Sequence, residues 1–161
     1  VVNVLALTTA DCGLTPAQYG VVMGFNGGLI MVFELPLNQW VRRYELKWVL
    51  VAGFAIVGLG TAAFGVMHTQ GGFLAAMALF TLGEMLSLPT GMSYASLLAP
   101  ETFRGRYFGI RGMVWALAGM MGSSGVWFYG RIGGTWWLIA GGIGMLGGAL
   151  MLFRPRPAAA R

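Results

Sequence analysis

Apolar residues run through this chain in five long segments that short polar stretches separate. The segments cover residues 19–41, 48–67, 73–97, 107–129 and 136–153. Each falls within the roughly 17 to 25 residues that a helix needs to cross about 30 Å of hydrocarbon. The pattern therefore predicts an all-α fold, a polytopic membrane helix bundle with five complete transmembrane helices.

A shorter apolar stretch, residues 1–7, precedes these segments and is too short to cross a bilayer. Residues 8–18 follow it as a polar, turn-rich loop. We expect residues 1–7 to be the end of a sixth helix and the chain to be part of something larger. On this interpretation residues 1–161 form a single transmembrane domain.

Polar and small residues gather on one side of the segment 73–97. On a helical wheel of about 100° per residue, leucines occupy the other side, where Ser93 is the exception. Helices in lipid turn a polar stripe inward, toward their neighbours. The stripe consists of Met77, Thr81, Glu84, Ser87, Gly91 and Tyr94.

Glu84 is the acid within this stripe, and about a dozen mostly uncharged residues flank it on each side. A charged side chain at the centre of a bilayer costs roughly 2.5 to 3.5 kcal/mol, so it faces a cavity or a partner and marks a pathway. We expect Glu84 to be a proton carrier or a contact for a cationic substrate. The alternative is a structural acid bonded to a neighbouring helix.

Composition excludes several classes of protein. Hydrophobic residues make up 57% of the chain and charged residues only 9%, against about 25% charged in an average soluble domain. The net charge of +5 arises from short basic clusters between apolar segments, which argues against a nucleic-acid partner. We expect no metal and no other cofactor, because no Cys/His cluster is present. A membrane enzyme has the weakest support, because no nucleophile has a base beside it.

The basic residues also predict an orientation. Nine of the ten lie in the stretches 42–47 and 104–111 and in the tail 154–161, and only Arg131 lies in the alternate loops. Because basic loops remain in the cytoplasm, we expect the C-terminus there and residues 8–18 outside. The predicted location is the bacterial inner (plasma) membrane.

Two stretches carry a resemblance to a known family. LPLNQWVRRYELKWVLVAG resembles the loop between the eighth and ninth helices of the major facilitator superfamily, although it lacks the acid of that family's signature loop. TLGEMLSLPTGMSYASLLAPETFRGRYFGIRGMVWALAGMMGSSG resembles the tenth and eleventh helices, with the elements PExxR and RGRYFG. Within that family, the chain most resembles the proton-coupled drug-efflux branch.

The resemblance implies the C-terminal six-helix half of a secondary transporter that works by alternating access. It implies proton-coupled transport of small molecules, with efflux of amphiphilic compounds expected. The implied partners are the lipid bilayer, the missing N-terminal half, protons and the small-molecule substrate. The alternative is a non-transporting, membrane-embedded subunit or scaffold.

The resemblance also implies positions for functional residues. The helices that hold Asn26, Glu84 and Trp115 would line the cavity, joined by Thr81 and Ser87 from the polar stripe. Asn26 has a second interpretation as a hydrogen-bonding link between helices.

A cytoplasmic gating network is expected at the basic end of the bundle. Glu101 would pair with Arg42 or Arg43 in the outward-open state. Glu34 and Arg111 would pair across two helices, or else Arg111 would reach the interface alone. The expected network comprises Arg42, Arg43, Glu101, Arg104, Glu34 and Arg111.

Overall fold

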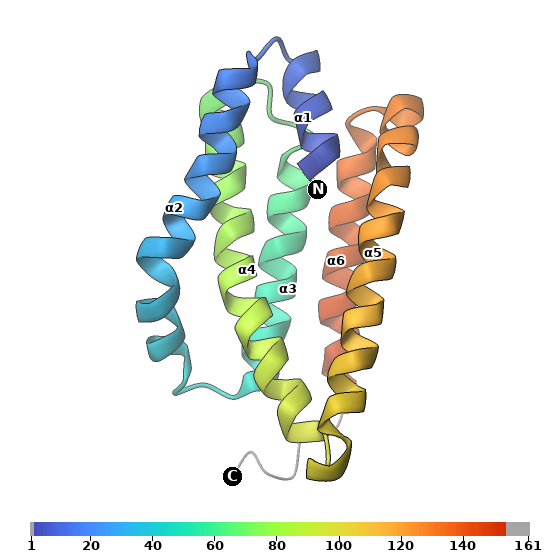
Figure 1. Ribbon diagram of the computed structural model, residues 1–161. Coiled ribbons are helices and arrows are strands. Elements are labelled where there is room, and N and C mark those ends of the chain that lie inside the picture. The colour runs from blue at the N-terminus through green and yellow to red at the C-terminus, as the bar shows by residue number, and fades with distance from the viewer. Residues whose placement is uncertain (1, 154–161) are drawn as a thin grey trace.

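The computed structural model describes residues 2–153, except for the side chain of residue 121, and these residues are helical except at short turns. Val1 and the basic tail 154–161 lie outside the described residues. Long helices run up and down along one axis (Figure 1). The elements are α1 (Val2–Asp11), α2 (Pro16–Val41), α3 (Leu46–Ala63), α4 (Gln70–Leu98), the 3₁₀ turn η1 (Glu101–Phe103), α5 (Arg104–Ile132) and α6 (Thr135–Leu152).

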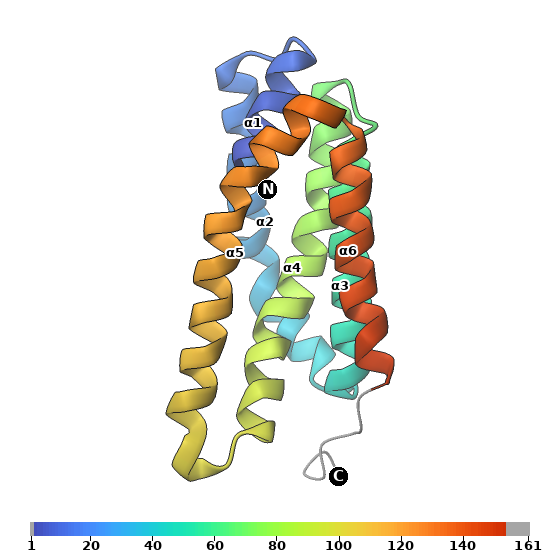
Figure 2. The same cartoon turned by 90° about the vertical axis from the view of Figure 1, so that its right-hand side faces the viewer.

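Helix α3 is the centre of the packing. It contacts α4 along one side and α6 along the other, and α2 packs against α4. By contrast, α5 makes few contacts, which go mainly to α1 and α6. Figure 2 shows α5 standing apart from α4 along most of its length. Most of the described α5 side chains are therefore exposed within this chain.

Glycines allow the backbones of α3, α4 and α6 to approach closely. A Cβ atom added at Gly60 of α3 would lie 2.5 Å from the Phe80 nitrogen of α4. On α6, a Cβ atom at Gly148 would lie 3.0 Å from Phe54 Cβ. Small residues at helix interfaces favour such packing in lipid. By contrast, the stripe of Gly20, Gly24 and Gly28 on α2 has no atom of the described chain within 4 Å of an added Cβ, so that face is uncovered.

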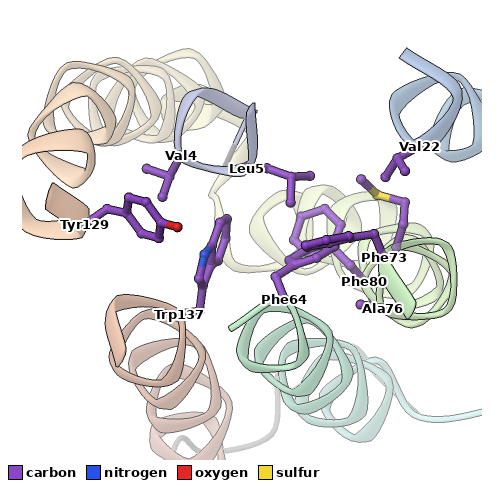
Figure 3. Close-up of a cluster of buried hydrophobic side chains, with 10 residues drawn as sticks. Val4, Leu5, Val22, Phe64, Phe73, Ala76, Phe80, Tyr129 and Trp137 are labelled. Atoms are coloured by element: carbon purple, nitrogen blue, oxygen red, sulfur yellow. The ribbon is translucent and has the colours of Figure 1, made fainter. Parts of the chain in front are cut away.

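An aromatic cluster closes the end of the bundle that carries α1 (Figure 3). Phe64 at the end of α3, Phe73 of α4 and Trp137 of α6 are almost completely buried there, and Leu5 of α1 packs among them. The indole N–H of Trp137 donates to Thr8 Oγ1 at 2.9 Å. The cluster therefore ties the short helix α1 to the rest of the bundle.

The loop predicted at residues 8–18 is shorter in the structure, because both neighbouring helices extend into it. Helix α1 continues to Asp11, and the Thr8 and Thr9 hydroxyls are satisfied within it by carbonyls one turn earlier. A capping box between Thr15 and Gln18 then starts α2, with Pro16 in its first turn. The other helices begin within three residues of the predicted segments, and α3 ends at Ala63 instead of residue 67.

Among the described helices, α2, α3, α4 and α6 are long and apolar enough to cross a membrane. This confirms an all-α structure with four helices that could cross a membrane, whereas the bounds and the number of the spans stay predictions. Helix α5 has 29 residues, but its glycines, serines and arginines lower its mean hydropathy. The fifth complete span therefore stays a prediction.

Close packing of α3 on α4 predicts that Gly60→Ala destabilises the protein. The added methyl group would meet backbone atoms of Phe80, so the two helices would have to separate. We expect a loss of about 1 to 3 kcal/mol, the usual cost of overpacking, seen as a lower melting temperature in detergent. Gly142→Ala on α6 is the control, because its added Cβ has no atom within 4 Å. Equal melting temperatures for the two variants would contradict the described contact.

The predicted orientation can be tested by cysteine labelling in a Cys12→Ala background. Gln70 lies at the α1 end of the bundle, where it hydrogen-bonds Gln18, and Tyr44 lies in the loop at the opposite end. We expect an impermeant maleimide added outside cells to label Gln70→Cys. Tyr44→Cys should react only in inverted vesicles. The reverse pattern would overturn the orientation.

Candidate functional site

Three of the predicted site residues meet where α2 crosses α4. The Asn26 side-chain amide of α2 donates to Thr81 Oγ1 at 2.8 Å and to Glu84 Oε2 at 3.1 Å, both on α4. The Thr81 hydroxyl donates in turn to the Met77 carbonyl at 2.7 Å. Both N–H groups of one amide therefore connect the polar stripe of α4 to α2.

Helical spacing explains why these groups converge. Thr81 and Glu84 are three residues apart, so they share one face of α4 and one amide can reach both. Gly83, which precedes Glu84, faces the other way and allows α3 to approach at Val57. At the level of Glu84, α4 is therefore held between α2 and α3.

Glu84 is partly buried, and only one of its two carboxyl oxygens accepts a hydrogen bond among the described residues. Oε2 accepts the Asn26 bond, whereas no hydrogen bond among the described residues uses Oε1. No basic side chain in the described part of the chain forms an ion pair with it. The carboxyl group can keep its bond to Asn26 and still carry a proton, or meet a cation, at Oε1.

Ser87 and Trp115 have different surroundings. The Ser87 hydroxyl lies 3.5 Å from the backbone carbonyl of Glu84, and the residue packs closely against Gly53 of α3. Its role in the structure is therefore helix packing. Trp115 lies on the loosely packed α5 with 57% of its surface exposed. The expected lining role of both residues stays a prediction.

The stripe on α4 faces inward as predicted. Thr81, Met77, Ser87 and Tyr94 are buried, whereas Leu82 and Leu97 on the opposite side are exposed.

At the basic end, the described contacts are local. Glu101 lies 4.0 Å from Arg104, three residues along the chain. Arg43 donates its Nε–H to the Trp40 carbonyl at 3.1 Å, and Arg42 caps the end of α2. The described ion pairs do not join Glu101 to either arginine in this state, so the expected bracing contact stays a prediction.

Arg111 contacts α4 instead of Glu34. Its Nη1 atom lies 3.2 Å from the place where a Cβ atom would stand on Gly91. Glu34 accepts a bond from Asn38 through its backbone carbonyl, and no ion pair links it to Arg111 within residues 2–153. Gly91 belongs to the predicted stripe, and its lack of a side chain makes room for the guanidinium group, which the spacing alone does not indicate.

One further link between helices escaped the sequence analysis. The Tyr129 hydroxyl of α5 donates to Asp11 Oδ2 at the end of α1, at 2.9 Å. A tyrosine near one end of a span is ordinary at a membrane interface, so the pattern alone does not single it out.

Comparison with known proteins decides the family. The model of the Major Facilitator Superfamily matches residues 1–161. The chain belongs to this superfamily. As a superfamily member with apolar spanning helices, it is an integral membrane protein of a transporter family.

Similar proteins in bacteria are transporters. The chain is 26% identical to a "Na(+), Li(+), K(+)/H(+) antiporter" of Planococcus maritimus over 84% of its own length and 32% of the antiporter. It is 26% identical to "Multidrug resistance protein MdtH" of Edwardsiella ictaluri over 96% of its length and 40% of that protein. It is 32% identical to the "Uncharacterized MFS-type transporter YttB" of Bacillus subtilis over 65% of its length and 27% of that protein.

The chain thus spans well under half of the length of these relatives. No solved structure matches it.

The Asn26–Glu84 contact predicts measurable coupling between the two side chains. In a double-mutant cycle of Asn26→Ala and Glu84→Ala, we expect a coupling energy of about 0.6 kcal/mol, and at most about 1.7, as for other bonds between membrane helices. Reversible unfolding in mixed micelles measures it. The control cycle pairs Glu84→Ala with Asn38→Ala, whose amide bonds the Glu34 carbonyl instead. Equal coupling in both cycles would contradict the contact.

Proposed function

We propose that this chain is the C-terminal six-helix half of a secondary transporter that moves small molecules across the bacterial inner membrane in exchange for protons. The observation that carries this proposal is the carboxyl group of Glu84. It lies partly buried within a membrane-type helix, with Asn26 as its described side-chain donor and with Oε1 open.

The exchange would use competition for one carboxyl group. Low polarity disfavours a charged carboxylate, so Glu84 would bind a proton or a cation in turn. Asn26 and Thr81 would hold Oε2 in place while Oε1 is loaded. Access to the site would alternate as this half rocks against the other half.

The names of the relatives support a substrate of this kind. One relative is named as an antiporter of alkali cations and protons, and another as a multidrug resistance protein. A carboxylate beside amide and hydroxyl groups would suit either a metal cation or an organic cation. We favour amphiphilic organic compounds, because α5 exposes an adaptable apolar surface. Its residues Met113, Trp115 and Met120 are more than half exposed in this chain.

The exposed faces also support the missing-half part of the proposal. Helix α5 and the glycine stripe of α2 present surfaces that no described residue covers. A second six-helix half would cover them and supply the other wall of the cavity.

This proposal predicts that Glu84→Gln abolishes proton-driven transport in the full-length protein. Glutamine keeps the shape of the side chain and can still accept the Asn26 bond, so expression and melting temperature should change little. Binding of cationic compounds should weaken and lose its pH dependence, because an amide does not titrate. Transport in proteoliposomes with an imposed pH gradient measures the first effect, and ligand binding across pH values measures the second.

Glu45→Gln serves as the matched control, because Glu45 precedes α3 outside the polar stripe. It should transport near the parental rate. If Glu84→Gln transports at the parental rate with the parental pH profile, the acid is structural and the proposed coupling is wrong.

A further inference from the structure

A cavity lined by both polar and apolar residues lies away from Glu84, at the end of the bundle that carries Arg42. Helices α2 and α4 meet at Asn26 and separate toward this end, as Figure 1 shows. Both helices contain a proline in this half, Pro36 and Pro89. The space between them is a cavity of about 600 Å³.

The lining of this cavity does not belong to the face of α4 that carries Glu84. Thr90 and Ser93 line it, and they lie about 240° and 180° around the helix from Glu84 at 100° per residue. This position accounts for Ser93, the one polar residue on the leucine side of the helical wheel. Asn38 of α2 and the loop residues Arg42, Tyr44 and Glu45 complete the polar part of the lining, which therefore holds one basic and one acidic side chain. The cavity therefore lies on a different side of α4 from the proposed transport site.

An apolar groove continues from this cavity. It has a volume of about 240 Å³, and the two hollows share Val41, Tyr44 and Val49. Trp40 and Trp48 line the groove, and the Trp40 and Tyr44 rings pack edge to face at 5.1 Å. Tryptophan and tyrosine gather where membrane helices meet the lipid headgroups. The cavity and an apolar groove therefore join at the level expected for headgroups.

The lining itself balances Arg42 against Glu45, and it is the charge of the surrounding loops that favours an anion. Among residues 42–47 and 99–106, the five basic residues outnumber the two acidic ones, for a net charge of +3. An arginine that lines a cavity at a membrane surface is suited to a lipid phosphate. The neighbouring groove offers aromatic walls in place of further polar groups, which suits a hydrocarbon chain.

We propose that this pair of hollows binds one anionic phospholipid of the adjacent leaflet. Its phosphate lies at Arg42, its headgroup hydroxyls face Asn38, Thr90 and Ser93, and one acyl chain follows the groove along Trp40 and Trp48. The site requires only that the helices lie in a bilayer, so it is independent of the proposed role of Glu84. Its occupant holds α2 and α4 apart at this end.

The test titrates the full-length protein with phosphatidylglycerol and, separately, with phosphatidylcholine, and counts bound lipids by native mass spectrometry. The parental protein should bind phosphatidylglycerol more tightly. Arg42→Gln should weaken phosphatidylglycerol binding about fivefold, the effect of one basic residue at a lipid surface. Arg106→Gln removes the same charge at the same end but outside the cavity, where that guanidinium lies 5.3 Å from the centre of the Phe103 ring. It should have a clearly smaller effect.

A second variant tests the groove without changing charge. Ala52 lines the groove and is exposed, so Ala52→Trp fills the hollow from its surface. It should weaken the binding of both lipids. If Arg42→Gln and Arg106→Gln weaken lipid binding equally, the general positive charge of the surface explains the binding, and the proposed site is wrong. Unchanged lipid binding in Ala52→Trp, or displacement of the lipid by a transported cation, would overturn it as well.

Discussion

The side-chain amide of Asn26 allows a carboxyl group to remain within the long apolar helix α4. By donating to both Thr81 and Glu84, it fixes the level at which α2 crosses α4. An acid in lipid without such a partner would be costly, and the described chain offers Glu84 no cation in its place. The same bond leaves Oε1 without a hydrogen bond among the described residues, and the proposed exchange depends on this open oxygen.

The packing of α3 with its neighbours depends on glycines. Helices α3, α4 and α6 form a tightly packed layer because glycines bring their backbones together. Helix α5 lies outside this layer and is attached mainly near its ends, where Tyr129 bonds Asp11 and Arg111 rests over Gly91. Within the described residues, α5 is therefore held by fewer contacts than the other long helices.

Helix α4 carries polar groups on two sides, and the two sides have different surroundings. Thr81 and Glu84 face α2 in the middle of the helix, whereas Thr90 and Ser93 line the cavity beyond Pro89. The divergence of α2 and α4 separates these environments along the helix. The proposed transport site uses the side of α4 that faces α2, and the proposed lipid site uses the cavity.

The sequence by itself determined the helices, the inward stripe of α4 and the candidate acid, because hydrophobic periodicity and the cost of charge in lipid act locally. Only the tertiary structure decided which neighbour each residue meets. The glycine stripe of α2 meets no described residue, whereas glycines of α3, α4 and α6 bring those three helices together. The position of Arg111 near the end of its segment suggested either a pair with Glu34 or a side chain that reaches the interface alone, whereas the guanidinium lies near Gly91. Such contacts depend on where helices that are far apart in the sequence cross, and no local sequence pattern determines that position.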